Sequence, residues 1–198
     1  GIFIISPTDK GGHLHTPSKK LLELCSPLHP IVFNDLFCLT DKRVHTISVG
    51  ASESKDLNLH LEAIGLLSNS NNLLPAIENR LREAAHSSLG EEWITTWDQG
   101  LPSWENTPGE INIPILLWLH NLVEAWGMDG YAKARYGLLG NAGHWFPGSN
   151  ADCLDKEVSE ESLKDVLIKS PWRNEIPDLL RSLRNKLSTE SYKRLSES

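Results

Sequence analysis

The chain has 198 residues, of which 39% are hydrophobic and 23% charged, and its formal net charge is −7. That length suits one medium domain or two small ones, and the lack of a long apolar run excludes a transmembrane helix. No secretory signal is visible in these residues and no Lys/Arg cluster stands out, and the three cysteines, Cys25, Cys38 and Cys153, are far apart. We therefore expect a cytoplasmic protein with reduced thiols, no membrane partner and no nucleic-acid partner.

The first fourteen residues predict a buried strand that runs into a loop. Ile2–Ile5 is a short apolar run of β-branched and aromatic residues, and Ser6-Pro7 ends it before a Gly-rich segment. Ligands of parallel α/β sheets bind at the carboxyl ends of the strands. Residues 6–12 are therefore a candidate ligand-binding loop. The alternative is an ordinary turn whose glycines supply positive φ angles.

The chain then alternates between helix and strand patterns. Ser18 is a candidate N-cap for a helix that ends near Leu24, residues 30–39 carry a helical apolar face, and residues 44–49 form a second β-rich run. Ser54 is a candidate N-cap for a helix over 55–67, whose apolar residues share one face: Leu57, Leu61, Ile64 and Leu67.

This order predicts parallel strands joined by right-handed crossovers, either in an open sheet or in a (β/α)8 barrel. Two parallel strands cannot form a stable sheet alone, because parallel strands need neighbours that bury both faces. We therefore expect the chain to be a truncated portion of a larger fold.

From residue 68 onward the strand pattern disappears. Residues 68–72 form a polar linker and residues 73–100 carry one continuous helical pattern. Further helices are expected at 113–126, 128–139, 159–168 and 175–187, and residues 140–148 form a Gly-rich aromatic loop that either caps a core or binds a partner. The predicted parts are a β/α part over 1–67, a linker with a long helix over 68–110, and a helical extension over 111–198.

Segments in both main parts resemble a known family. Ile4-Ile-Ser-Pro-Thr-Asp-Lys-Gly-Gly-His-Leu14 and Val44-His-Thr-Ile-Ser-Val-Gly-Ala-Ser52 are similar to the seventh and eighth barrel strands of the aldo/keto reductase superfamily. Asn112-Ile-Pro114, Tyr136-Gly-Leu-Leu-Gly140 and Gly143-His-Trp-Phe-Pro147 resemble the C-terminal extension of its bacterial oxidoreductase branch. The resemblance implies the last two strand–helix units of a (β/α)8 TIM barrel, followed by an all-helical, ferredoxin-like extension.

The resemblance also implies a binding site for NADP(H) or NAD(H). Ser6, Lys10 and Gly11 match the loop that folds over the pyrophosphate, and Gly50 and Ser52 match the turn after the eighth strand. Backbone N–H groups and a helix N-terminus are the usual partners of such an anion.

The adenosine end of this implied site departs from the family pattern. His60 matches a position that contacts the adenine, although the residue pattern alone equally allows a partly buried helix histidine. Position 53 is Glu53, where many relatives have an Arg that pairs with the 2′-phosphate, and Lys55 is a candidate substitute. A carboxylate at this point disfavours a phosphate and favours NAD(H) over NADP(H).

Two of the family's features are missing from the sequence. The catalytic Asp, Tyr, Lys and His of the family lie on earlier barrel strands, so we expect no catalytic residue in this chain. Many relatives carry an iron–sulfur motif in the extension, but only Cys153 is present here, with Lys156 and Ser159 at the following ligand positions. One thiolate cannot hold a four-iron cluster, so we expect no cluster and no other metal.

The sequence thus predicts the C-terminal portion of an oxidoreductase that transfers hydride between a nicotinamide dinucleotide and a small carbonyl substrate. This chain is expected to contribute the dinucleotide-binding side. The alternatives are a non-catalytic nucleotide-binding module and a helical interaction module.

Overall fold

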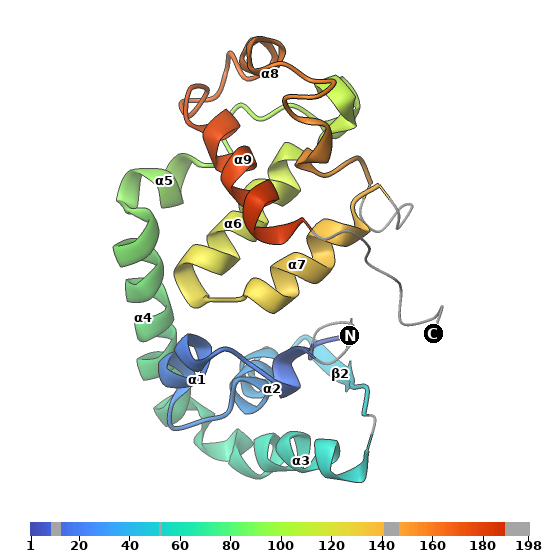
Figure 1. Ribbon diagram of the computed structural model, residues 1–198. Coiled ribbons are helices and arrows are strands. Elements are labelled where there is room, and N and C mark those ends of the chain that lie inside the picture. Colours follow the sequence, from blue (N-terminus) through green and yellow to red (C-terminus); the bar gives the residue numbers. More distant parts are fainter. Residues whose placement is uncertain (9–12, 52, 141–146, 189–198) are drawn as a thin grey trace. The chain divides into compact units, whose positions relative to one another are not determined.

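A computed structural model describes residues 1–8, 13–51, 53–140 and 147–188 (Figure 1). The chain is mostly helical and forms two compact units. The first unit comprises Gly1–Ala84 with Trp126–Met128, and the second comprises Ala85–Ala125 with Asp129–Ser198. Within the described residues, no helix has both the length and the apolar character needed to cross a membrane.

The first unit contains the two strands and the helices that follow them. Its strands are β1 (Ile2–Ile5) and β2 (Val44–Ser48), and its α-helices are α1 (Lys19–Cys25), α2 (Pro30–Thr40), α3 (Leu57–Leu66) and most of α4 (Ser70–Leu89). Short 3₁₀ turns precede α1 and α3, at His13–His15 and Ser54–Asp56, and another at Leu67–Asn69 leads into α4.

The two strands lie side by side and parallel, as the sequence pattern predicts. The register pairs Ile4 with Ile47 and Ile5 with Ser48, so both strands end at the same edge of the sheet. The helix α2, which connects them, packs on β2 and on α3. This is the arrangement of a β–α–β unit.

The core of the first unit lies between its helices. Cys25, Val32, Leu36 and Ile77 are at most 1% exposed, and they come from α1, α2 and α4. Ser18 caps α1, since its hydroxyl accepts a hydrogen bond from Leu21 N at 3.1 Å, which confirms the predicted N-cap.

One prediction of burial in this unit is wrong. The strand β1 is largely exposed, with Phe3 at 68% and Ile5 at 64%, because in the described chain β2 is the one element that contacts it extensively. On α3 the face that carries Leu61 and Ile64 is exposed, at 63% and 61%, and His60 is one of the buried residues of this helix. The N-cap also differs, since Ser54 lies inside the 3₁₀ turn that precedes α3.

The second unit is all-helical in the part of the chain that the structure describes. Its helices are α5 (Glu91–Thr96), α6 (Ile113–Trp126, whose last residue belongs to the first unit), α7 (Asp129–Leu138), α8 (Glu160–Val166) and α9 (Ile176–Leu187). The longest buried stripe is on α6, where Ile113, Leu116, Leu117 and Leu119 have no exposed surface. On α9, Ile176 and Leu180 are buried in the same way.

The segment from 68 to 100 differs from its prediction. The polar residues 68–72 are helical instead of a linker, and Ser70 at the start of α4 is only 4% exposed. The single helix predicted over 73–100 is broken at Gly90, whose φ is 82° and whose N–H donates to the His86 carbonyl at 3.0 Å. A glycine in the left-handed region after the last helical turn is a common helix stop.

Candidate functional site

The candidate site is the edge of the sheet at which β1 and β2 end. Because Ile5 pairs with Ser48 in parallel register, the loop that starts at Ser6 and the turn at Gly50 both leave the sheet on this side. Ser6 and Gly50, two of the residues predicted to bind the dinucleotide, therefore lie at the same edge of the sheet. This common edge is where ligands of parallel α/β sheets bind.

The start of the first loop is held in a fixed conformation. Ser6 has a φ of 56°, in the left-handed region that residues with a side chain rarely adopt. The Pro7 carbonyl accepts a hydrogen bond from Asn34 Nδ2 of α2 at 3.1 Å, and the Thr8 carbonyl accepts one from Leu14 N at 3.3 Å. The loop is thus tied to α2 at its beginning and closed on itself at Leu14.

Neither the backbone conformation nor the packing of the described residues requires a glycine at position 50. Its φ lies outside the left-handed region, and apart from its two chain neighbours a Cβ added to it would meet no heavy atom of the described residues within 4 Å. A glycine without a structural reason at the end of a parallel strand is a feature of sites where a ligand approaches the backbone closely.

The start of α3 carries more negative than positive charge. Lys55 Nζ lies 2.8 Å from Glu53 Oε1, and both side chains are more than half exposed. Asp56 adds a second carboxylate, which accepts a hydrogen bond from Glu53 N at 3.2 Å. Lys55, a predicted cofactor contact, is therefore paired with a carboxylate of its own chain. An added phosphate dianion would have to compete with Glu53 for it.

His60, the predicted adenine contact, lies inside the first unit. Its Nδ1 is 2.5 Å from Asp35 Oδ2, and the two residues are only 7% and 3% exposed. This pair joins α3 to α2. A ring that is buried to this degree offers little surface to an adenine, and the contact with adenine stays a prediction.

A histidine of the first loop lies next to this pair. The ring of His15 meets the ring of His60 edge-on, with their centroids 6.4 Å apart and the planes at 83°. Nε2 of both histidines and Oδ1 of Asp35 are buried and have no hydrogen-bond partner among the described residues. Burial, followed by the nearby charge of His15, lowers the pKa of His29. The rings of His15 and His60 therefore meet beside the buried carboxylate of Asp35.

The remaining predicted contacts, Lys10, Gly11 and Ser52, lie outside the described residues. Sequence reasoning missed Asp35 as a functional or structural residue. A signal was present, because Asp35 is a charged residue within the apolar helix pattern of 30–39, and a charge on such a face usually has a partner.

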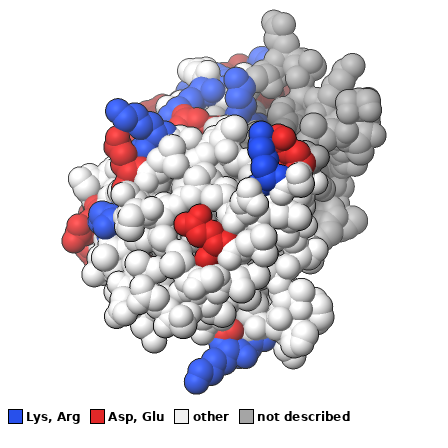
Figure 2. Space-filling model, turned by 90° about the horizontal axis from the view of Figure 1, so that it is seen from below, with Lys and Arg blue, Asp and Glu red and all other residues white. Residues whose placement is uncertain are grey.

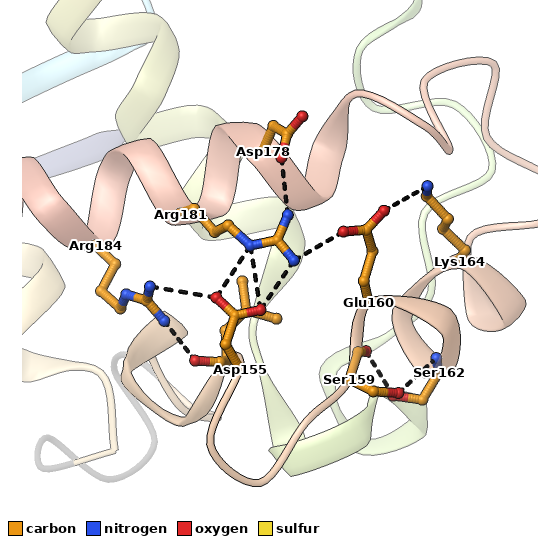
Figure 3. Close-up of polar contacts among 9 residues, drawn as sticks. Asp155, Ser159, Glu160, Ser162, Lys164, Asp178, Arg181 and Arg184 are labelled. Carbon is orange, nitrogen blue, oxygen red and sulfur yellow. Dashed lines mark hydrogen bonds and ion pairs between the residues drawn. The ribbon is translucent and has the colours of Figure 1, made fainter.

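The segment around Cys153, where the family's cluster motif would lie, carries an ion-pair network (Figure 3). Asp155, with a φ of 65°, accepts hydrogen bonds from Arg181 at 2.9 and 3.0 Å. Arg184 contacts the same carboxylate at 3.3 Å, and Arg181 also contacts Glu160 at 2.8 Å. The carboxylates therefore bind arginines of α9. Cys153 packs beside Gly109, where an added Cβ would lie 2.8 Å from its Sγ.

The tyrosines of the helical unit occupy structural positions. Tyr136 is 1% exposed, and its hydroxyl donates to Asp152 Oδ1 at 2.8 Å. Burial, together with that hydrogen bond, raises the pKa of Tyr136. Tyr131 packs edge-on against Trp118. Tyr192 lies outside the described residues.

The described residues include no group of three or more His, Cys, Asp or Glu side chains that is arranged to hold a metal ion. Comparison with protein families, with curated proteins and with solved structures finds no match to this chain.

Proposed function

We propose that this chain forms the dinucleotide-binding side of an oxidoreductase of the aldo/keto reductase type. In this proposal its two strand–helix units are the seventh and eighth of a (β/α)8 barrel. The intact enzyme transfers hydride between NAD(P)H and a small carbonyl substrate, and the residues that activate the carbonyl lie outside this chain.

The observation that carries the proposal is the common edge of the two strands. A dinucleotide pyrophosphate binds to backbone N–H groups of the turns that follow parallel strands, and strands that end together place two such turns at one edge. The left-handed Ser6 and the glycine without a packing role at position 50 support the same interpretation. The three cysteines are unpaired, which supports a reducing compartment such as the cytoplasm.

The charges near α3 support NAD(H) as the preferred cofactor. Glu53 is paired with Lys55, and Asp56 adds a second carboxylate to the same turn, where it accepts a hydrogen bond from Glu53 N. The additional 2′-phosphate of NADP(H) would meet a net negative surface, whereas the 2′-hydroxyl of NAD(H) can donate to a carboxylate.

Calorimetric titration of the chain with NADH and with NADPH tests the proposal. We expect NADH to bind more tightly, and we expect Glu53→Gln to narrow the difference by removing one negative charge. Asp165→Asn, an exposed change in the second unit, is the control. No binding of either dinucleotide would contradict the proposal, and a preference for NADPH that Glu53→Gln leaves unchanged would contradict the cofactor assignment.

A further inference from the structure

Three histidines of the first unit gather around one buried carboxylate. His60 Nδ1 of α3 lies 2.5 Å from Asp35 Oδ2 of α2, and the ring of His15 lies edge-on to the ring of His60. His29, the residue before α2, is close enough to His15 for a charge on one ring to act on the other. One set of titratable groups therefore connects the His13–His15 turn to both helices.

The contacts of His15 and His29 suit uncharged rings. His29 Nδ1 accepts a hydrogen bond from Ile31 N at 3.2 Å and so caps α2, which requires that this nitrogen carry no proton. His15 Nε2 is buried and has no hydrogen-bond partner among the described residues, so a proton there would find no acceptor among them. Burial, followed by the nearby charge of His15, lowers the pKa of His29 from 6.5.

Little negative charge is near enough to stabilise added protons on these rings. The buried carboxylate of Asp35 is already paired with His60. Glu62 of α3 is exposed, and its charge opposes the lowering of the His29 pKa without cancelling it. Residues 57–77 contain no other Asp, Glu, Lys or Arg. Figure 2, which looks onto the side on which α3 lies in Figure 1, accordingly shows few charged groups over most of this face.

The other ionisable groups that face the cluster add no negative charge. Arg80 of α4 donates to the Ser26 carbonyl, three residues before His29, and so adds a positive charge on that side. Burial, followed by the charge of Asp35, raises the pKa of the Cys38 thiol, so this thiol is uncharged at neutral pH. A proton gained by His15 or His29 is therefore poorly compensated while the turn is in place.

We propose that His15 and His29 form a pH-sensitive latch, which holds the His13–His15 turn on α2 and α3 while both rings are neutral and releases it when both gain a proton. Two positive rings repel each other, and the cap of α2 is lost with the free electron pair of His29 Nδ1. Release into water removes the cost of burying these charges. It also breaks the hydrogen bond from Leu14 N to the Thr8 carbonyl. The inference concerns the conformation of this turn and needs no dinucleotide.

The number of protons taken up determines how steeply the release depends on pH. Histidine is the side chain that ordinarily gains its charge between pH 5 and 8. The pKa of His29 is lower in the folded unit, so its contribution to holding the turn is complete above 6.5 and is lost as the pH falls. Uptake of one proton shifts the release equilibrium up to about tenfold per pH unit, and uptake of two shifts it up to about a hundredfold.

Methyl NMR of the chain, with labelled leucine and valine, tests the latch between pH 7.5 and pH 5. Leu14, in the turn, packs partly buried against the core of the first unit, and Val32 of α2 has no exposed surface. We expect the Leu14 signals to move at least about halfway toward their positions in the urea-unfolded chain, with a slope of about two protons, while the Val32 signals stay in place. Leu14 signals that do not move, a slope of one proton or less, or an equal change at Val32, which would mean that the whole unit opens, would overturn the inference.

Two substitutions each remove one titrating ring and keep its contact. His15→Phe keeps a ring beside His60, and His29→Asn keeps an acceptor for Ile31 N, so each should reduce the slope to about one proton. His45→Gln, which removes an exposed histidine of β2, is the control and should keep the slope of the unmodified chain. A slope that neither His15→Phe nor His29→Asn lowers would also overturn the inference. The Leu14 signals are read without ligand, so a failure to bind NADH at pH 7.5 would contradict the proposed function alone.

Discussion

His60 Nδ1 lies 2.5 Å from Asp35 Oδ2, and this buried pair connects α3 to α2 in the first unit. His15, in the short turn His13–His15 that follows the first loop, packs its ring edge-on against His60. This polar contact between α2 and α3 therefore also supports the segment that leads from the loop into α1.

Removing the carboxylate of this pair should destabilise the first unit. Asp35→Ala leaves the His60 imidazole buried without its partner, and the expected loss in the free energy of unfolding is about 2 to 4 kcal/mol. Asp35→Asn keeps an acceptor for the Nδ1 proton and should lose less. Amide hydrogen exchange of α2 and α3 measures the change locally. Asn58→Ala, an exposed substitution on α3, is the control, and equal protection in Asp35→Ala and Asn58→Ala would show that the pair has no structural role.

Arg181 should be important for the stability of the second unit. Its guanidinium contacts Asp155, Glu160 and Asp178, and its side chain is 25% exposed. Arg181→Met keeps the apolar stem but removes these contacts, and we expect a loss of about 1 to 2 kcal/mol. Trp fluorescence in urea follows this unit, since every Trp except Trp126 belongs to it. Lys169→Met, an exposed change in the same unit, should have no effect, and an equal midpoint for both variants would contradict the role of Arg181.

The same network predicts how the stability of the second unit depends on pH. Hydrogen bonds from Arg181 lower the pKa of Asp155, and hydrogen bonds from Lys164 and Arg181 lower the pKa of Glu160. A carboxyl group whose pKa is lower in the folded state contributes stability that is complete above its unfolded pKa and is lost as the pH falls through its folded pKa. The free energy of unfolding of the second unit should therefore decrease as the pH falls below 4.5, the ordinary pKa of Glu160. It should decrease further below 3.8, the ordinary pKa of Asp155. Urea unfolding at pH 7, 5, 4 and 3 measures this decrease, and a decrease just as steep in Arg181→Met would rule out the network as its cause.

Cys25 should resist alkylation while the first unit is folded. It is 1% exposed, and burial raises the pKa of its thiol to about 11, so very little thiolate is present at pH 8. We expect iodoacetamide to modify Cys38 and Cys153, which are partly exposed, well before Cys25. Peptide mass spectrometry at successive times distinguishes the three sites, and rapid labelling of Cys25 would mean that the helical core opens readily.

Local patterns predicted much of the fold. The observed bounds of α6, Ile113–Trp126, are those predicted from its apolar run, and Ser18 caps α1 as expected. The parallel pairing of β1 and β2 followed from the alternation of strands and helices. In each case the deciding information lies within a few residues of the element, or in a general rule of chain connection.

The remaining features depend on contacts between distant residues. The periodicity of α3 correctly grouped Leu57, Leu61 and Ile64 on one stripe, but periodicity does not say which stripe of a helix a neighbour covers. The pairing of Asp35 with His60 joins residues 25 positions apart, and neither residue type identifies the other as its partner. At the candidate site, the sequence predicted which turns meet, but not that Lys55 pairs with Glu53.

The central claim is that the common edge of β1 and β2 binds a dinucleotide. The most direct test is a substitution that adds a single methyl group at this edge. Gly50→Ala and Gly65→Ala both place a Cβ where, beyond the neighbouring backbone, no atom of the described residues lies within 4 Å, so neither should disturb the fold, but only Gly50 is at the site. We predict that Gly50→Ala weakens the calorimetric affinity for NADH about tenfold by blocking the approach of the ligand to the backbone, while Gly65→Ala binds like the unmodified chain. Equal affinity of the two variants for NADH would contradict the claim.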